Sequence, residues 1–467
     1  MAASIPGLPG VALSGLALSK SRVAAFASPS AALSGVGIPI TVYMPAYYAS
    51  DLGLGLAAVG AAFMLAKLWD VVTDPVAGIV TDNVRTRWGR RRLWVAVGTP
   101  IMFASAILIY FPERIHPDGI TQNYLLLGLI GLYAGYTLVT ISITSWGAEL
   151  STNYHRRSQI QGAIAFAGLF GNLVLLSLPA LLELFDDATV LSDRMEIMGL
   201  FVVIALPLTT VIALTFVPEP NVPPTPPIGL RRAFQTVAAN RHMVRLLVVD
   251  LLLSFPSSVR GVVYIFIIGH VIQRPDWTSG ILVLYMIVNV IAVPAWVRIS
   301  KYTGKHKAVA AGLLGHGVFA LAYLLPGPGD IALFVGVHLV SAFVYGGHSF
   351  LIRSMVADVT DVDTLASGQQ RAGLFYSLVT MTNKIGMALG IGIAYPVLDW
   401  IGFDPAGNND PTAINGLRYL FVLTPFVAEM MVAWIIYHYQ LDEKAQQEIR
   451  SQLEQADQIS EDSPTER

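Results

Sequence analysis

The feature that most constrains the fold is a succession of long apolar segments that fills almost the whole chain. Segments of about twenty apolar residues, the helix length that crosses the hydrocarbon core of a bilayer, recur twelve times along the sequence. They lie near residues 23–49, 55–81, 93–112, 122–148, 159–182, 196–217, 246–272, 277–298, 308–326, 330–355, 374–399 and 417–440. A helix satisfies its own backbone polar groups in lipid. The pattern therefore predicts an all-α membrane protein with twelve transmembrane helices.

Composition excludes several classes of function. The chain is 54% hydrophobic and only 13% charged, which is typical of a polytopic membrane protein. A formal net charge of −2 argues against a nucleic-acid partner. The absence of cysteine excludes disulfides, thiol catalysis and cysteine metal sites. There is no P-loop for direct ATP coupling and no convincing pair of nucleophile and base, so we do not expect an enzyme.

The distribution of lysine and arginine predicts the orientation in the membrane. If both termini are cytoplasmic, 22 of the 29 basic residues lie on that side and four on the other, as expected for short loops that retain positive charge. Lys20 and Arg22 follow the apolar N-terminal stretch, so no secretory signal is predicted. We expect an integral protein of the plasma membrane, the inner membrane of a bacterium, that acts as a monomer.

A proline-rich segment, residues 218–227, separates two sets of six spans. The expected organisation is a cytoplasmic tail (1–22), a six-helix bundle (23–217), a cytoplasmic linker (218–245), a second six-helix bundle (246–440) and a cytoplasmic tail (441–467). The loop at 82–92 (DNVRTRWGRRR) is echoed at 298–307 (RISKYTGKHK). Paired six-helix repeats with a binding site near the midplane are typical of secondary transporters.

Two carboxylates, Asp70 and Asp74, lie deep within the second span. A charge at that depth costs roughly 3 kcal/mol or more, so a functional role is the default interpretation. Residues four apart share one helix face and lie about 6 Å apart along the axis, where like charges repel. A bound cation or proton would remove that repulsion. Alternatively Lys67, on the same face, neutralises Asp70 and leaves Asp74 alone as a proton carrier or a protonated bystander.

Three separate motifs resemble those of the glycoside-pentoside-hexuronide cation symporters, the melibiose permease group of the major facilitator superfamily. The first is 69–78 (WDVVTDPVAG) with the loop that follows it. The second is 147–157 (GAELSTNYHRR). The third runs from 355–363 (MVADVTDVD) through 368–376 (GQQRAGLFY) to 384–386 (KIG). The resemblance covers most of the chain and implies the two-bundle major facilitator fold.

The resemblance also implies a cation site. By position, its ligands are Asp70, Thr73, Asp74 and Thr137, with Thr73 standing where the permease has an asparagine. Oxygen ligands suit a hard cation, and Na⁺ and H⁺ remain alternatives. Lys384, in the middle of span eleven, matches the family's helix XI lysine and is expected to form a coupling network together with Lys67. The other interpretation is that Lys384 pairs with an acid to hold the halves together. No other metal or cofactor is expected.

The substrate positions depart from the family pattern. The family's ionisable sugar-binding residues fall near Gly35, at Thr140 and near Ala165, and none is ionisable here. Arg260 adds a charge within span seven and is a candidate for contact with an anionic group such as a uronate carboxylate. An internal salt bridge is its alternative role. Further candidates to line a sugar-sized cavity are Tyr43, Tyr47, Tyr136, Thr140, Trp146, Tyr264, Tyr376 and Asn383.

Charged residues at the expected cytoplasmic ends of the helices are candidate gating elements. Ion pairs that form in one access state and break in the other bias alternating access, whereas permanent surface pairs contribute under about 1 kcal/mol. The candidates are Asp82, Arg85, Arg90, Arg91, Glu149, Arg157, Asp358, Asp361 and Arg371.

The function predicted from the sequence is cation-coupled symport of a sugar-type substrate, a glycoside or hexuronide, by alternating access. Because the family's polar sugar-binding residues are missing, a symporter of an amphiphilic anion such as a lysolipid is the nearest alternative. A membrane sensor that does not transport is a further one. Polar cavity walls favour a sugar, and an apolar cleft open to the bilayer favours a lipid.

Overall fold

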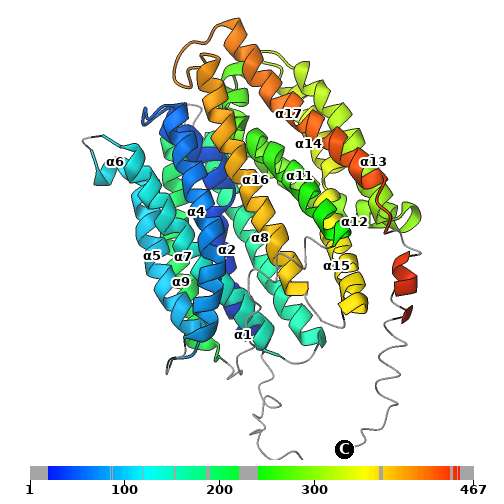
Figure 1. Ribbon diagram of the computed structural model, residues 1–467. Coiled ribbons are helices and arrows are strands. Elements are labelled where there is room, and N and C mark those ends of the chain that lie inside the picture. Colours follow the sequence, from blue (N-terminus) through cyan, green and yellow to red (C-terminus); the bar gives the residue numbers. More distant parts are fainter. Residues whose placement is uncertain are drawn as a thin grey trace, which may run out of the picture. The chain divides into compact units, whose positions relative to one another are not determined.

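The computed structural model describes residues 19–84, 86, 88–117, 119–151, 154–185, 190–219, 240–367, 372–441, 445–449 and 451–452. Across these residues the regular structure is helical (Figure 1), apart from one isolated bridge between Thr86 and Gly89. Twelve helical segments of the described chain are long and apolar enough to cross a membrane. The predicted all-α fold and the number of spans are therefore confirmed.

The helices before the linker supply the first six spans. They are α1 (Lys20–Ala27), α2 (Pro29–Leu33), η2 (Ser34–Val36), η3 (Pro39–Tyr43), α3 (Met44–Ala49), α4 (Leu56–Asn83), α5 (Arg91–Tyr110), α6 (Pro112–Ile115), α7 (Gln122–Glu149), α8 (Tyr154–Phe185) and α9 (Leu191–Phe216).

The helices after the linker supply the other six. They are α11 (Arg241–Phe266), η4 (Ile267–Ile272), η5 (Pro275–Trp277), α12 (Thr278–Thr303), α13 (Lys305–Ala320), η6 (Leu321–Leu324), α14 (Ile331–Tyr345), α15 (His348–Ser367), α16 (Ala372–Trp400) and α17 (Pro411–Tyr437).

The chain packs as two compact units. The N-terminal unit comprises residues 1–40, 72–178 and 193–227, and the C-terminal unit comprises 41–71, 179–192 and 228–467. Packing therefore does not follow the order of the sequence, because two segments that precede the linker belong to the C-terminal unit. One of them contains the first half of α4, so this helix contributes to both units.

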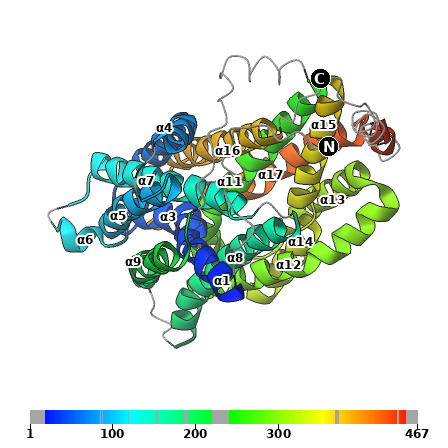
Figure 2. The ribbon, with the colours of Figure 1, turned by 90° about the horizontal axis from the view of Figure 1, so that it is seen from below.

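Small residues bring α5 and α7 together in the N-terminal unit, where the two helices lie side by side (Figure 2). A Cβ on Gly135 would lie 2.6 Å from the backbone nitrogen of Met102, and one on Gly98 would lie 2.9 Å from the carbonyl oxygen of Gly135. Helices that lack side chains at the contact approach closely and gain packing energy, which is the main source of helix association in lipid.

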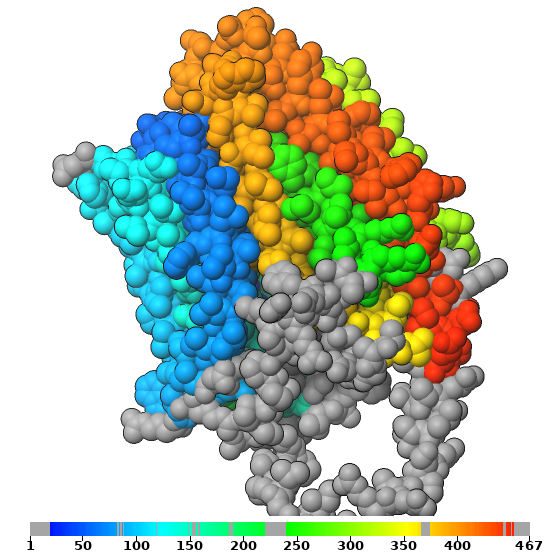
Figure 3. Space-filling view, viewed as in Figure 1, coloured from blue at the N-terminus to red at the C-terminus, as the bar shows by residue number. Residues whose placement is uncertain are grey.

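Helices α11 and α16 pack in the same manner in the C-terminal unit. A Cβ on Gly386 would lie 2.6 Å from Cβ of Ser254, and one on Gly390 would lie 2.4 Å from Cβ of Ser258. The Ser258 hydroxyl donates to the carbonyl oxygen of Met387 at 2.9 Å. The side chains of α16, α11 and α17 form a continuous face of this unit (Figure 3). These contacts hold α11 and α16 in a fixed register.

Two spans are broken rather than continuous. In the first, Pro39 has no N–H to donate to the carbonyl of Gly35, and the Tyr110 hydroxyl donates to that carbonyl at 2.7 Å instead. The tenth span is interrupted between α14 and α15 at Gly346 and Gly347. A Cβ on Gly347 would lie only 2.3 Å from Cγ of Trp296, so the close passage of Trp296 requires glycine at this point.

Large apolar side chains remain exposed along the helices. This is the pattern of surfaces that face lipid, because contact with acyl chains removes the cost of exposing them. Among the most exposed are Val72, Leu127, Phe166, Leu184, Ile204, Val211, Ile291, Val318 and Trp434.

Candidate functional site

Asp70 is almost completely buried in the C-terminal unit, with an exposed fraction of 1%. Lys384 Nζ lies 2.8 Å from Asp70 Oδ2, and Lys67 Nζ lies 3.6 Å from the same oxygen. A buried carboxylate is tolerated when it is paired with opposite charge. The lysine of α16 is therefore the closer partner of Asp70, and the neutralising role considered for Lys67 is shared between two lysines.

Asp74 has a different environment, in the N-terminal unit. The Thr137 hydroxyl, on α7, donates to Asp74 Oδ1 at 2.9 Å, and Thr137 is buried. Two of the four side chains that the resemblance assigned to one cation site, Asp74 and Thr137, are therefore in direct contact. Thr73 is partly buried beside Asp74 on α4.

Pro75 leaves one backbone carbonyl oxygen of α4 without its helical hydrogen bond, a further candidate ligand that the motif does not indicate. Pro75 lies inside α4 and has no N–H to donate to the carbonyl of Val71, one turn earlier. Carbonyl oxygens are ordinary ligands for hard cations. The turn of α4 that carries Asp70 and Asp74 thus also presents a main-chain oxygen.

A polar cavity of about 330 Å³ lies between α11, α15 and α16 in the C-terminal unit. Its volume is at the lower end of ligand pockets, roughly 300–1,000 Å³. Two predicted substrate residues, Tyr376 and Asn383, line it. The cavity is also lined by Asp250, Arg353 and His348, which were not among the predicted substrate-binding residues. A lone aspartate within the apolar run at 246–253 was the available signal, because charges within spans are costly unless they serve a function.

A second cavity, of about 260 Å³, lies in the N-terminal unit. Tyr136 and Thr140 line it, as predicted for substrate-binding residues, together with Ser34 and Asn172. Within the described part of the chain, Thr140 Oγ1 and Asn172 Oδ1 are buried without a hydrogen-bond partner. Buried polar atoms that no protein group satisfies point to a ligand or water. The cavity surrounds the positions that carry the family's sugar-binding charges, but the side chains that line it here are uncharged.

Arg260 belongs to a network inside the C-terminal unit. Its Nη1 lies 3.2 Å from His316 Nε2, and His316 Nδ1 lies 2.6 Å from a carboxylate oxygen of Glu429. The guanidinium also stacks over the rings of Tyr323 and Phe421, 5.1 Å from each centroid. This arrangement corresponds to the internal pairing considered as the alternative, although Glu429 and Arg260 belong to the same sequence half. The charge of Arg260 is thus balanced without substrate.

Four aromatic residues predicted to contact substrate are enclosed by protein, so the structure gives them a packing role. Tyr43, Tyr47, Trp146 and Tyr264 are each at most 3% exposed. The Tyr43 hydroxyl donates to Ser279 Oγ at 2.8 Å, and the Tyr264 hydroxyl donates to the carbonyl of Thr278 at 3.0 Å. Tyr47 packs edge-on against Tyr48, and Trp146 against Phe26. A side chain buried to this degree has no surface to offer a ligand in this conformation.

Three candidate gating residues of the N-terminal unit, Arg90, Arg91 and Glu149, form one cluster. Glu149 Oε1 accepts from Arg90 at 2.6 Å and from Arg91 at 3.0 Å. Glu219, just after α9, accepts from the backbone N–H groups of Arg90, Arg91 and Arg92 and so caps α5. Arg85, Arg371 and the side chains of Asp82 and Arg157 lie outside the described residues.

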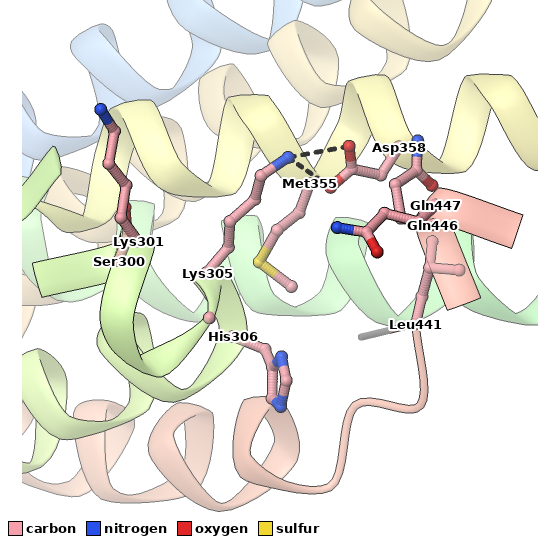
Figure 4. Close-up of a pocket in the computed structure, with 10 residues that line it drawn as sticks. Ser300, Lys301, Lys305, His306, Met355, Asp358, Leu441, Gln446 and Gln447 are labelled. Carbon is pink, nitrogen blue, oxygen red and sulfur yellow. Dashed lines mark hydrogen bonds and ion pairs between the residues drawn. The ribbon is translucent and has the colours of Figure 1, made fainter. Parts of the chain in front are cut away.

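A corresponding ion pair occurs in the C-terminal unit, at the echo of this loop. Lys305, at the start of α13, donates to both carboxylate oxygens of Asp358, at 2.7 and 2.8 Å (Figure 4). Asp361 accepts from Gln446 at 2.7 Å. The internal repeat seen in sequence is thus matched by a repeated contact, a basic residue at the start of one helix paired with an acid on another. Each pair lies within one unit.

The twelve-span fold, with paired charges inside its helices, is that of a polytopic membrane protein. Residues 25–443 match the family described as MFS/sugar transport protein. The chain belongs to this family, and the resemblance to cation symporters is confirmed.

Relatives support the same class across nearly the whole chain. An uncharacterized symporter of Bacillus subtilis, YnaJ, is 22% identical over 93% of this chain and 94% of its own length. A glucuronide carrier protein homolog of Escherichia coli is 22% identical over 87% and 90%. The isoprimeverose transporter of Lactiplantibacillus pentosus is 24% identical over 89% and 87%.

Solved structures show the same fold. The nucleoside transporter NupG has a TM-score of 0.62 at 15% identity, over 90% of this chain and 99% of that one. The xylose transporter XylE from Escherichia coli, in an inward-open conformation, has a TM-score of 0.56 at 16% identity, over 92% and 97%.

Proposed function

We propose that the protein is a cation-coupled symporter of a sugar-type substrate, a glycoside or a hexuronide, that works by alternating access in a bacterial inner membrane. The observation that carries the proposal is the contact between Asp74 and Thr137, a carboxylate and a hydroxyl in the interior of two membrane-spanning helices. Relatives named as a putative glycoside/cation symporter and as an isoprimeverose transporter support the substrate class.

The proposed cation ligands are oxygens of Asp74 and Thr137, with Thr73 and the Val71 carbonyl available on the same turns of α4. Asp70 pairs with Lys384 at 2.8 Å, and Asp74 is the carboxylate that contacts the Thr137 hydroxyl, so we place the cation at Asp74. Hard oxygen ligands suit Na⁺, and a carboxylate also takes a proton. Both ions therefore remain candidates.

Lys384 gives a physical route to coupling. Its ammonium pairs with Asp70, four residues before Asp74 on the same helix α4. A cation at Asp74 would change the charge on the helix that carries the partner of Lys384, where charges interact strongly because the dielectric constant is low. Asn383, the adjacent residue on α16, lines the polar cavity of the C-terminal unit. Coupling requires that ion and substrate each raise the affinity for the other, and α16 carries a residue for each.

The cavity walls favour a sugar over a lysolipid. Ten of the thirteen residues that line the cavity of the C-terminal unit carry polar side chains. Hydroxyl and amide groups pair with sugar hydroxyls, whereas an acyl chain would leave them unsatisfied at a cost of about 1–3 kcal/mol each.

The test is uptake by the purified protein in proteoliposomes. Labelled glycosides, hexuronides and lysolipids are offered under an imposed Na⁺ gradient, an H⁺ gradient or none. We expect sugar uptake that one gradient stimulates and that Asp74→Asn abolishes. Asp399→Asn is the matched control, because it makes the same chemical change at an exposed position on α16. Gradient-independent uptake that is indifferent to Asp74→Asn would refute the symport mechanism.

A further inference from the structure

The cavity between α11, α15 and α16 is built from three polar stripes on largely apolar helices. On α11 the lining residues are Asp250, Leu253, Ser254 and Ser257, and on α16 they are Tyr376, Val379, Thr380 and Asn383. Both sets follow the i, i+3, i+4, i+7 spacing of one helix face. The third set, His348, Ser349, Ile352 and Arg353, lies at the start of α15. Ionisable residues inside membrane spans are costly and rare, so Asp250 and Arg353 in this cavity mark a candidate functional site.

Two opposite charges face this cavity. Asp250 is partly buried, and its Oδ2 accepts from the Thr382 hydroxyl at 2.9 Å. Arg353 is exposed and close enough to Asp250 to interact with it electrostatically. Within the described part of the chain, no hydrogen bond is formed by the Arg353 guanidinium, although its carbonyl accepts from Tyr376 at 3.2 Å. An arginine inside a candidate span, at a cavity wall and with its five donors unused, is placed to receive an acceptor.

We infer that this cavity binds a carboxylated sugar, with the guanidinium of Arg353 pairing with the carboxylate of a hexuronide. This inference rests on the proposed sugar symport and narrows its substrate class. The planar fork of arginine matches a carboxylate in two parallel hydrogen bonds. Asp250 Oδ1 accepts a sugar hydroxyl at the other end of the ligand.

The remaining polar groups are also arranged for hydroxyls. Asn383 donates to Ser254 Oγ at 2.7 Å, which leaves its carbonyl oxygen as an acceptor. His348 Nδ1 is held 2.6 Å from the carbonyl of Tyr345, so its Nε2 is the nitrogen available to a ligand. The break between α14 and α15 produces this arrangement, because it puts His348 and Arg353 on a helix with its own start. The carboxylate of Asp250 and the guanidinium of Arg353 lie at different points of the cavity, so together they fix the orientation of the ligand.

The same cavity accounts for two departures from the family pattern. The cavity of the N-terminal unit has lost its ionisable groups, and Arg260 is committed to His316 and the neighbouring rings. Recognition of charge then falls to Arg353. The sequence suggested that an arginine contacts a uronate carboxylate, and we now assign that contact to Arg353 in place of Arg260.

The test compares methyl glucuronides and methyl galacturonides with the matched methyl glycosides, which carry CH₂OH in place of the carboxylate. Binding to the purified protein is measured by calorimetry, and uptake is measured in proteoliposomes. We expect the wild type to bind a hexuronide about 10- to 100-fold more tightly than its matched glycoside, the range of about 1.5–3 kcal/mol for a hydrogen bond to a charged group. Arg353→Gln should abolish this preference and leave glycoside affinity within about threefold.

Two further variants separate recognition from folding. Arg353→Lys keeps the positive charge but loses the planar guanidinium that forms two parallel hydrogen bonds, so it should retain only part of the preference for hexuronides. Arg298→Gln makes the same change as Arg353→Gln at an exposed position on α12 and should leave the preference intact. Thermal unfolding confirms that each variant folds.

The outcomes distinguish this inference from the proposed function. Cation-driven glycoside uptake without a hexuronide preference, or a preference unchanged in Arg353→Gln, would overturn the inference and leave sugar symport standing. Preference for a lysolipid, or no sugar binding or uptake by the folded wild type, would overturn both.

Discussion

Glu183, near the end of α8, caps the first turn of α12 through Ser279. Its carboxylate accepts from the backbone N–H of Ser279 at 3.0 Å, from the Ser279 hydroxyl at 2.7 Å and from the N–H of Gly280 at 3.2 Å. Glu183 is 6% exposed. The two helices come from different halves of the sequence, but both residues lie in the C-terminal unit. A negative group at a helix N-terminus is favoured by the helix dipole and by the unpaired N–H groups.

We predict that Glu183→Gln shifts the protein toward the state in which this contact is broken. The substitution removes the charge but keeps the size, and a charge-assisted hydrogen bond is worth about 1.5–3 kcal/mol. The chain has no cysteine, so Ser349→Cys in the cavity gives a single label. Labelling by an impermeant maleimide from the side predicted to be extracellular should accelerate about tenfold or more. An unchanged rate would show that the contact does not limit access.

Thr137→Val should weaken cation activation about tenfold. Valine has nearly the shape of threonine but leaves Asp74 without the hydroxyl that donates at 2.9 Å, and the expected loss is about 1–1.5 kcal/mol. The measurement is the cation concentration that gives half-maximal uptake. Thr137→Ser retains the hydroxyl and should behave as wild type, so equal defects in both variants would argue against a ligand role.

Lys384→Met should destabilise the protein more than the double variant Asp70→Asn, Lys384→Met. The single change removes the closer of the two lysines that pair with buried Asp70, since Lys67 lies 3.6 Å away, and removal of one partner of a buried pair costs about 3–5 kcal/mol. The double change removes both charges. Thermal unfolding in detergent measures this cycle. Additive effects of the two substitutions would show that the ion pair contributes little.

Glu429→Gln should lower stability without changing the substrate preference. Glu429 is 2% exposed and balances Arg260 through His316, so its neutralisation leaves a buried cation uncompensated. The hexuronide-to-glycoside ratio should remain that of the wild type, in contrast to Arg353→Gln. A changed ratio would indicate that the Arg260 network contacts substrate after all.

The sequence was sufficient for the architecture because membrane helices carry a strong signal. A run of about twenty apolar residues admits few other structures, and an ionisable residue inside such a run stands out. Asp70, Asp74 and Lys384 were found in this way, and the contact of Asp74 with Thr137 was anticipated from the family motif. Boundaries were less well predicted, because helices such as α11, which begins at Arg241, extend beyond the apolar run.

The substrate side was harder to predict for a physical reason. An aromatic residue looks the same in sequence whether it faces a cavity or a neighbouring helix, and Tyr43 and Tyr264 face neighbours. Arg353 is one of the 22 basic residues that the charge distribution assigns to the cytoplasmic side, so it did not stand out as a candidate. Only the packing of α11 against α16, together with the break before α15, brings Asp250 and Arg353 to the same cavity.

The glycine break between α14 and α15 separates the proposed substrate contacts on α15 from the packing of α14. Trp296 donates to the carbonyl of Phe343 at 2.8 Å and fixes the end of α14, while the cavity-lining face of α15 begins only at His348. Substitutions at 349 and 353 can therefore alter the proposed recognition of substrate while the packing of α14 is preserved, whereas His348 also contacts Tyr345 at the end of α14.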